Sequence, residues 1–210
     1  MSDAASPAAP TLNETVNVAL AVPCTEAEGP GHRYALWVQG CPMRCVGCCN
    51  PEFLAFREKD RRSVDDVVAD ILRAGADQGI EGISLLGGEP TRQAKALRHV
   101  AAAARAAGLT VMIFSGYTLQ ELKDEADDDV LALLSLTDLL VDGRYEESQR
   151  TTTRRYIGSD NQVLHFLSDR YAVDDARFAA PNTVELRVLI DKGTGALTIN
   201  GWPVLGARTR

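Results

Sequence analysis

The sequence has no long apolar run and no secretory leader. None of its 210 residues fall in a stretch approaching the roughly 20 apolar residues that a membrane-spanning helix needs. The first residues, MSDAASPAAPTLNE, have neither a basic start nor an apolar core, so we expect no secretory signal. These absences predict a cytoplasmic protein without a membrane partner.

An excess of positive charge is also absent. Lys and Arg number 22 against 29 Asp and Glu, which gives a net charge of −7. The densest basic stretch is Thr153-Arg154-Arg155, and no basic run is interleaved with aromatic residues. A nucleic acid is therefore not expected as a partner. The acidic run at 124–129 is typical of a solvated loop or a helix end.

Several catalytic signatures are missing as well. The three histidines, His32, His99 and His165, are scattered and suggest no catalytic dyad. The glycine-rich segment L-L-G-G-E-P at 85–90 lacks the spacing and the Lys-Ser/Thr pair of a nucleotide-binding P-loop. No internal repeat is evident.

Cysteine, by contrast, is concentrated in one place. Four of the five cysteines lie within nine residues: Cys41, Cys45, Cys48 and Cys49, with Cys24 upstream. In a reducing compartment such clustering indicates a metal or redox site rather than a disulfide framework. Thiolates separated by three and then two residues can surround one cubane cluster, and soft sulfur ligands favour iron–sulfur clusters or zinc.

The alternative is a structural zinc site with Cys49, Cys24 or His32 as its fourth ligand. Structural zinc usually has two separated ligand pairs, and this chain has no second pair. The spacing therefore favours an iron–sulfur cluster on Cys41, Cys45 and Cys48, with one iron left open for chemistry. Cys49 is expected to point away from that cluster, as a packing residue or a redox liability.

The rest of the chain predicts an α/β fold in three parts. We expect a disordered tail at 1–14, a core at 15–165, and an extension at 166–210 with a β-hairpin over 183–203. Strands are predicted near 15–22, 34–39, 83–88, 109–115 and 137–142, and helices near 64–74, 93–107 and 118–125. Ser63 is a predicted N-cap, and Thr118 with Glu121 has the pattern of a capping box.

The predicted strands and helices alternate from residue 34 onward, which indicates a parallel sheet. In each unit the polar or glycine-containing residues come just after the strand, at the carboxyl edge where α/β sheets carry their ligands. The cysteines, Gly87-Gly88-Glu89, Ser115 and Asp142 are therefore expected to meet on one rim.

These motifs, in this order, resemble the radical S-adenosylmethionine (radical SAM) superfamily. The most similar branch is that of the activating proteins of anaerobic ribonucleoside-triphosphate reductase. The resemblance covers about residues 17–165 and rests on six segments: G-P-G-H-R at 29–33, Q-G-C-x-x-x-C-x-G-C-x-N at 39–50, G-G-E-P-x-x-Q at 87–93, S-G-Y-T at 115–118, L-V-D-G at 140–143 and G-S-x-N-Q at 158–162.

The resemblance implies a partial, open (β/α)6-type radical SAM barrel with the hairpin as a C-terminal addition. It also implies one 4Fe–4S cluster on Cys41, Cys45 and Cys48, with SAM as the second cofactor. Gly87, Gly88 and Glu89 would bind the SAM amino group. The remaining residues expected at the SAM ribose or carboxylate, or in a late family motif, are Ser115, Asp142, Arg144, Asn161 and Gln162.

The implied reaction is reductive cleavage of SAM to methionine and a 5′-deoxyadenosyl radical, with a flavodoxin or ferredoxin as electron donor. The expected partner is a glycyl radical enzyme such as anaerobic ribonucleotide reductase. Two alternatives stay open from the sequence. The first is a radical SAM enzyme that modifies a metabolite or peptide directly, and the second is a non-catalytic iron–sulfur or zinc protein.

Overall fold

A computed structural model of the chain describes residues 14–179. The expected tail falls outside this range apart from Glu14, and the expected β-hairpin at 183–203 lies wholly outside it.

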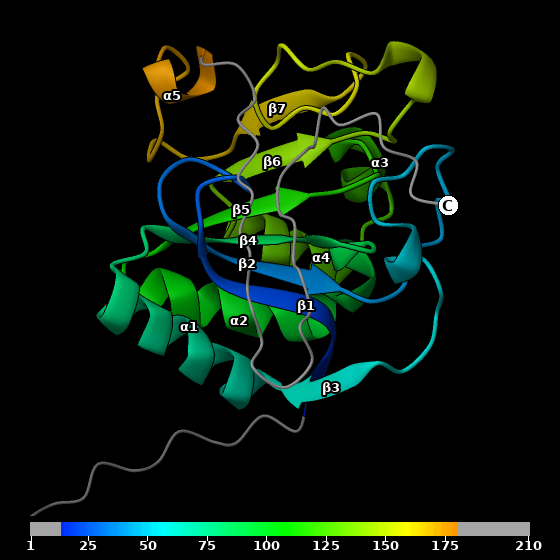
Figure 1. The fold of residues 1–210 in the computed structure, drawn as a ribbon. Helices are drawn as coiled ribbons and strands as arrows, with labels where there is room; N and C mark the ends of the chain where they lie inside the picture. Colours follow the sequence, from blue (N-terminus) through cyan, green and yellow to red (C-terminus); the bar gives the residue numbers. More distant parts are fainter. Residues whose placement is uncertain (1–13, 180–210) are drawn as a thin grey trace, which may run out of the picture.

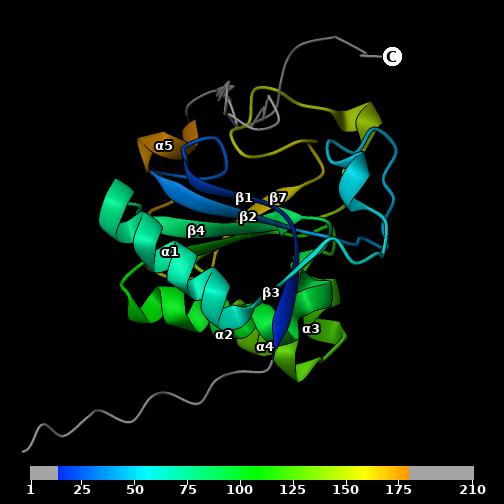
Figure 2. The same cartoon turned by 60° about the horizontal axis from the view of Figure 1, so that its bottom comes forward.

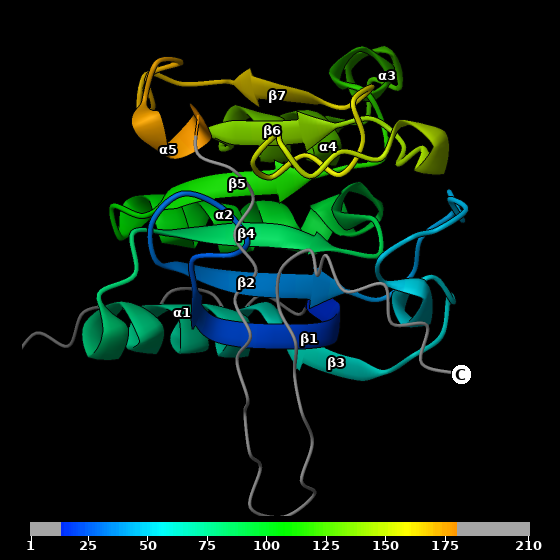
Figure 3. The ribbon, with the colours of Figure 1, turned by 45° about the horizontal axis from the view of Figure 1, so that its top comes forward.

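Within residues 14–179 the strands form one seven-stranded sheet in the order β3-β1-β2-β4-β5-β6-β7 (Figure 1). The strands are β1 (Thr15–Thr25), β2 (Arg33–Val38), β3 (Asp60–Ser63), β4 (Gly82–Gly87), β5 (Thr110–Phe114), β6 (Leu139–Asp142) and β7 (Val163–Phe166). The central strands β2, β4, β5 and β6 are parallel, while the outer pairings of β1, β3 and β7 are antiparallel. The sheet is open (Figure 3), so the expected α/β class is confirmed.

Helices cover one face of this sheet. They are α1 (Val64–Gln78), α2 (Ala94–Ala106), α3 (Leu119–Asp124) and α4 (Asp128–Ser135), and the short α5 (Ala176–Ala179) follows β7. Helices α1 to α4 lie on the same side of the sheet (Figure 2). Among residues 14–179, no helix combines the length and the apolarity that crossing a membrane would take.

The predicted helix starts are confirmed. Ser63 accepts a hydrogen bond from the amide of Asp66 at the start of α1, and Thr118 and Glu121 form a reciprocal capping box at α3. These contacts satisfy amide groups that the first turn of a helix leaves without partners. The acidic run at 124–129 ends α3 and begins α4, where Asp127 caps the amide of Val130.

Strands β3 and β7 and helices α4 and α5 were not predicted. Strand β3 has the sequence D-R-R-S, with no apolar residue, because it is an edge strand held by main-chain pairing with β1. Strand β7 is four residues long and pairs with β6. Helix α4 follows so closely on α3 that the sequence indicated one helix where the structure has two.

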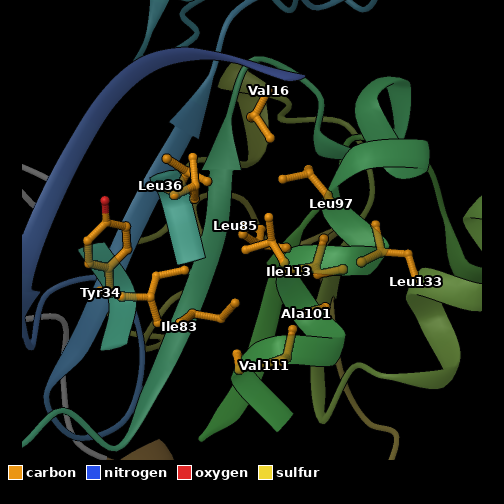
Figure 4. Close-up of a cluster of buried hydrophobic side chains, with 14 of the residues drawn as sticks. Val16, Tyr34, Leu36, Ile83, Leu85, Leu97, Ala101, Val111, Ile113 and Leu133 are labelled. Carbon is orange, nitrogen blue, oxygen red and sulfur yellow. The ribbon is translucent and has the colours of Figure 1, made fainter. Parts of the chain in front are cut away.

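The main core lies between the sheet and helices α1, α2 and α4. Its strand residues include Leu36, Leu85 and Ile113, which meet Leu97 of α2 and Leu133 of α4, all at most 1% exposed. Figure 4 shows these side chains facing one another across the interface. Burying apolar surface of this kind is the main stabilising contribution in folding, so the central strands are fixed in place.

The opposite face of the sheet carries two smaller apolar clusters. One centres on Trp37 and Leu86, and the other on Met112, Val141 and Tyr171. Both faces of the sheet are therefore covered. Because β2, β4, β5 and β6 are parallel, their carboxyl ends lie at one edge of the sheet. The functional candidates lie there.

Candidate functional site

The cysteine loop and the Gly-Gly-Glu turn are joined by main-chain hydrogen bonds. The amide of Gly88 donates to the carbonyl of Val38 at 2.7 Å, and the amide of Glu89 donates to the carbonyl of Gly40 at 2.9 Å. A Cβ on Gly88 would lie 2.3 Å from the oxygen of Gly40. Only glycine permits this approach, which brings the turn after β4 directly against the start of the cysteine loop.

The cysteine loop is closed by the segment that follows it. The amide of Gly40 donates to the carbonyl of Phe53 at 2.8 Å, and that of Cys41 donates to Leu54 at 3.1 Å. Within the loop, the amide of Cys48 donates to the carbonyl of Cys45 at 3.2 Å. The three candidate ligands therefore sit on one compact turn at the end of β2.

The thiols differ in burial and in acidity. Cys41 is buried, Cys45 and Cys48 are half-buried, and Cys49 is exposed. Burial raises the pKa of Cys41 and of Cys45 above the ordinary value. A hydrogen bond from the Cys49 thiol lowers the pKa of Cys48 to about 6, which favours the thiolate at neutral pH. Cys24 packs in the main core, away from this loop.

The cysteine loop also contacts the ends of β5 and β6. A Cβ on Gly116, after β5, would lie 3.1 Å from the Met43 side chain, and one on Gly47 would lie 3.3 Å from the ring of Tyr145, after β6. The loop thus lies across three of the four parallel strand ends.

Glu89 is 1% exposed and its carboxylate accepts four hydrogen bonds. Oε1 accepts from the amide of Thr91 at 3.0 Å, its hydroxyl at 2.8 Å and the Ser115 hydroxyl at 3.0 Å, while Oε2 accepts from the amide of Gly116 at 2.8 Å. Burial raises the pKa of Glu89, and these four donors oppose that shift. Glu89 and Ser115 therefore tie the ends of β4 and β5 together.

Asp142 and Arg144 lie after β6 in different surroundings. The buried Asp142 carboxylate accepts a hydrogen bond from the amide of Leu119 at 2.6 Å and lies 2.8 Å from His165 Nε2. The exposed Arg144 guanidinium is 3.1 Å from the Glu121 carboxylate. Asp142 thus joins the end of β6 to the start of α3, whereas Arg144 lies at the surface.

The G-S-x-N-Q segment holds the turn after β6. Gln162 Nε2 donates to the carbonyl of Gly143 at 2.8 Å, and Asn161 Nδ2 donates to that of Arg144 at 2.8 Å. Asn161 Oδ1 is buried and has no hydrogen-bond partner among the described residues. Every predicted site residue therefore lies on or beside one rim of the sheet.

The sequence analysis did not predict every residue of this rim. Tyr117 has the guanidinium of Arg92 4.5 Å from its ring centre and that of Arg144 5.9 Å away, so it links the turns after β4, β5 and β6. Tyr117 falls inside the S-G-Y-T segment, so this motif could have identified it as a residue of the rim. Nothing in the sequence marked the contact of His165 with Asp142.

The donor set of the loop fits an iron–sulfur cluster. Three thiols lie on one turn at the carboxyl edge of the sheet. Thiolates are the ligands that iron–sulfur clusters use. Within residues 14–179, no three His, Cys, Asp or Glu side chains converge closely enough to hold a single metal ion.

Comparison with known proteins agrees with this donor set. Residues 27–165 match the family model described as a 4Fe-4S single cluster domain. The chain therefore belongs to the family described as a 4Fe-4S single cluster domain.

Full-length relatives narrow the class further. The chain is 32% identical over 150 residues to the anaerobic ribonucleoside-triphosphate reductase-activating protein of Vibrio cholerae, covering 68% of this chain and 93% of the relative. Proteins of the same name from Enterobacteria phage T4 and Escherichia coli are 28% identical over 146 residues and 27% identical over 154 residues. These matches cover 68% and 69% of this chain, and 88% and 95% of the two relatives. The chain belongs to this family of radical SAM activating enzymes.

Proposed function

We propose that this enzyme reductively cleaves SAM and uses the resulting radical to install a glycyl radical on anaerobic ribonucleotide reductase. The observation that carries the proposal is the hydrogen bond from Glu89 N to Gly40 O. It joins the expected SAM-binding turn to the expected cluster loop at the carboxyl edge of a parallel sheet. The names of the relatives support the choice of partner.

The open sheet is proposed to correspond to the partial (β/α)6-type barrel of radical SAM enzymes. Strands β2, β4, β5 and β6 would form its parallel part. An open side leaves room for a large substrate, such as a glycine-bearing loop of another protein, to approach the rim.

The roles of the cysteines follow from their environment. Cys41, Cys45 and Cys48 are proposed to ligate three irons and to leave the fourth for SAM. The lowered pKa of Cys48 favours the thiolate that metal binding requires. When bound, the reduced cluster supplies the electron that cleaves SAM, and a flavodoxin or ferredoxin is the proposed source of that electron.

The SAM amino group is proposed to bind at Gly87, Gly88 and Glu89. Because four donors already occupy the Glu89 carboxylate, the main-chain carbonyls of the two glycines are the better acceptors for an ammonium group. Glu89 then acts by holding the turn in place together with Ser115.

Arg144 and Asn161 are proposed to contact the remaining polar groups of SAM. The ion pair of Arg144 with Glu121 has side chains 50% and 43% exposed, and such pairs contribute little stability. Arg144 is therefore able to exchange Glu121 for the SAM carboxylate. Asn161 offers Oδ1 as an acceptor, and Asp142 is proposed to position α3 and the turn after β6 around the ligand.

Anaerobic reconstitution tests this function. The protein loaded with iron and sulfide, then given dithionite and SAM, is expected to form 5′-deoxyadenosine. Cys45→Ala should abolish the product, whereas Cys24→Ser, at a buried thiol away from the loop, should retain it. A fully loaded cluster that gives no product, even with candidate substrates present, would contradict the proposal and favour an electron-transfer or structural role.

The partner is tested separately from SAM cleavage. A neighbouring gene for an enzyme with a C-terminal glycyl-radical motif would favour the activase. Cleavage of SAM stimulated by a metabolite or peptide, and not by such an enzyme, would favour direct modification of that substrate instead.

A further inference from the structure

A hollow of about 360 Å³ lies beside the point where β2 leads into the cysteine loop. Its lining comes from the start of β1, from β3, from the segment after the cysteine loop and from the start of α2, and it includes Gln39, Phe56, Arg61, Arg92 and Lys95. None of the described residues that line it is among those proposed to bind SAM. The hollow is therefore a separate feature of the same edge of the sheet.

An exposed aromatic ring connects this hollow to the cysteine loop. The Phe56 side chain is 65% exposed, yet a Cβ on Gly40 would lie 2.8 Å from its ring. Gln39 Nε2 donates to the carbonyl of Ala55 at 2.7 Å and so holds the residue before the ring. Since Gly40 directly precedes Cys41, a molecule that contacts Phe56 lies next to the loop proposed to carry the cluster.

The hollow is positively charged, although the protein as a whole is not. Three cationic side chains and one carboxylate line it, those of Arg61, Arg92, Lys95 and Glu14. The chain has a net charge of −7, so the positive charge is local. A patch of this kind attracts and orients a partner of the opposite charge.

Two of these cations are free to change partners. Arg61 lies 3.1 Å from Glu58, with side chains 55% and 72% exposed, and Lys95, 71% exposed, lies 3.5 Å from Glu14. Exposed ion pairs contribute little stability, so each cation can exchange its carboxylate for one on another protein. Arg92 is held by two hydrogen bonds to a single carboxylate. Arg61 and Lys95 are therefore the charges available to a partner.

We propose that the hollow is the docking site of the electron donor, and that the donor is an acidic electron-carrier protein. The inference rests on the proposed function, because it assumes a cluster on the cysteine loop. Phe56 provides the apolar contact beside the loop, and Arg61 and Lys95 bind carboxylates around the donor's redox group. One electron passes from the reduced donor to the cluster, and no bond or proton is exchanged in this step.

Binding is measured by isothermal titration of the oxidised, cluster-loaded protein with a flavodoxin of net negative charge. The double variant Arg61→Gln/Lys95→Gln removes two charges from the hollow. Arg73→Gln/Arg170→Gln is the matched control. Arg73 forms a surface pair with Asp70 on α1, and the exposed Arg170 lies at the opposite edge of the sheet, where it donates to the carbonyl that precedes β5.

The hollow variant should bind the flavodoxin about tenfold more weakly at low salt. The control variant should change the affinity by less than about twofold. At about 0.5 M salt the two variants should bind equally, because salt screens charges at the surface.

The rate of cluster reduction provides a second readout. Stopped-flow absorbance follows the reduction by reduced flavodoxin and by reduced methyl viologen, a small cation that needs no docking site. Arg61→Gln/Lys95→Gln should slow the flavodoxin reaction about tenfold at low salt and should not slow the viologen reaction. Phe56→Ala should slow the flavodoxin reaction at every salt concentration, because the contact that it removes is apolar. Electron paramagnetic resonance (EPR) checks that both donors give the same reduced cluster.

The two proposals fail in different ways. A flavodoxin that binds and reduces the two double variants equally well overturns the docking site, even when the enzyme cleaves SAM with dithionite. Binding of pyrophosphate that depends on Arg61 and Lys95, without such a dependence for flavodoxin, also overturns it and assigns the hollow to a small anion. A chain that assembles no cluster, or a loaded cluster that cleaves no SAM, overturns the proposed function itself.

Discussion

Replacing Glu89 with glutamine is expected to destabilise the fold even when no cofactor is present. The carboxylate accepts from four donors, three on Oε1 and one on Oε2. The glutamine side chain has only one oxygen, which can take the place of either Oε1 or Oε2. The more favourable orientation places the oxygen at the Oε1 position, facing Thr91 and Ser115. The NH₂ group then faces the amide of Gly116. One charge-assisted hydrogen bond is lost, and two donors are brought together.

A hydrogen bond to a charged group contributes about 1.5–3 kcal/mol. The neutral amide costs less to bury than the carboxylate, which offsets part of the loss. We therefore expect Glu89→Gln to lower the free energy of unfolding by about 2 kcal/mol. For a chain of this length that corresponds to a fall of about 4–8 °C in Tm.

The assay is denaturant and thermal unfolding of the cluster-free protein without SAM. Glu58→Gln is the matched control, because the Glu58 side chain is 72% exposed and pairs only with Arg61 at the surface. That variant should change the free energy of unfolding by less than about 0.5 kcal/mol. If Glu89→Gln proved as stable as Glu58→Gln, the structural role of Glu89 would be refuted, and a role confined to ligand binding would remain.

Two further predictions concern the same rim. In the cluster-free protein, the rate at which Cys48 is alkylated should rise with pH through a midpoint near pH 6 and then level off, because the Cys49 thiol lowers the pKa of Cys48 to about 6. Cys49→Ala should raise that midpoint, and Cys49→Ser should retain it. Mass spectrometry follows the alkylation. A rate for Cys48 that still rises tenfold per pH unit at pH 8 would contradict this. Gly88→Ala should cost about 1–3 kcal/mol of unfolding free energy and impair cluster loading, because its Cβ would lie 2.3 Å from the oxygen of Gly40. In contrast, Gly75→Ala, where a Cβ meets nothing within 4 Å on helix α1, should stabilise by about 0.5–1 kcal/mol; equal effects at the two glycines would show that the Gly88 contact is unimportant.

The sequence predicted the central strands and the rim because those features depend on local patterns. Apolar runs such as I-S-L-L alternate with helices that have clear caps, and this alternation determines a parallel sheet. Once the sheet is parallel, everything that follows its strands lies at one edge. The grouping of the cysteines with Glu89, Ser115 and Asp142 could therefore be predicted without a structure.

What the sequence did not predict depends on contacts between distant segments. Strand β3 carries no apolar residue, so only its pairing with β1 identifies it as a strand. The Glu89 carboxylate was expected to meet an ammonium group, and only the approach of Ser115 and Gly116 from β5 shows that it is already occupied by donors.

The most direct test of the central claim is EPR of the proposed partner after anaerobic activation. The reconstituted enzyme, reduced and given SAM, is mixed with the anaerobic ribonucleotide reductase of the same organism. We expect a protein-bound radical signal split into a doublet by one α-hydrogen, and we expect the splitting to collapse when the reductase carries deuterated glycine. It should be absent when Cys45→Ala replaces the unaltered enzyme. A fully loaded enzyme that cleaves SAM but leaves this reductase without a glycine-derived radical would contradict the account.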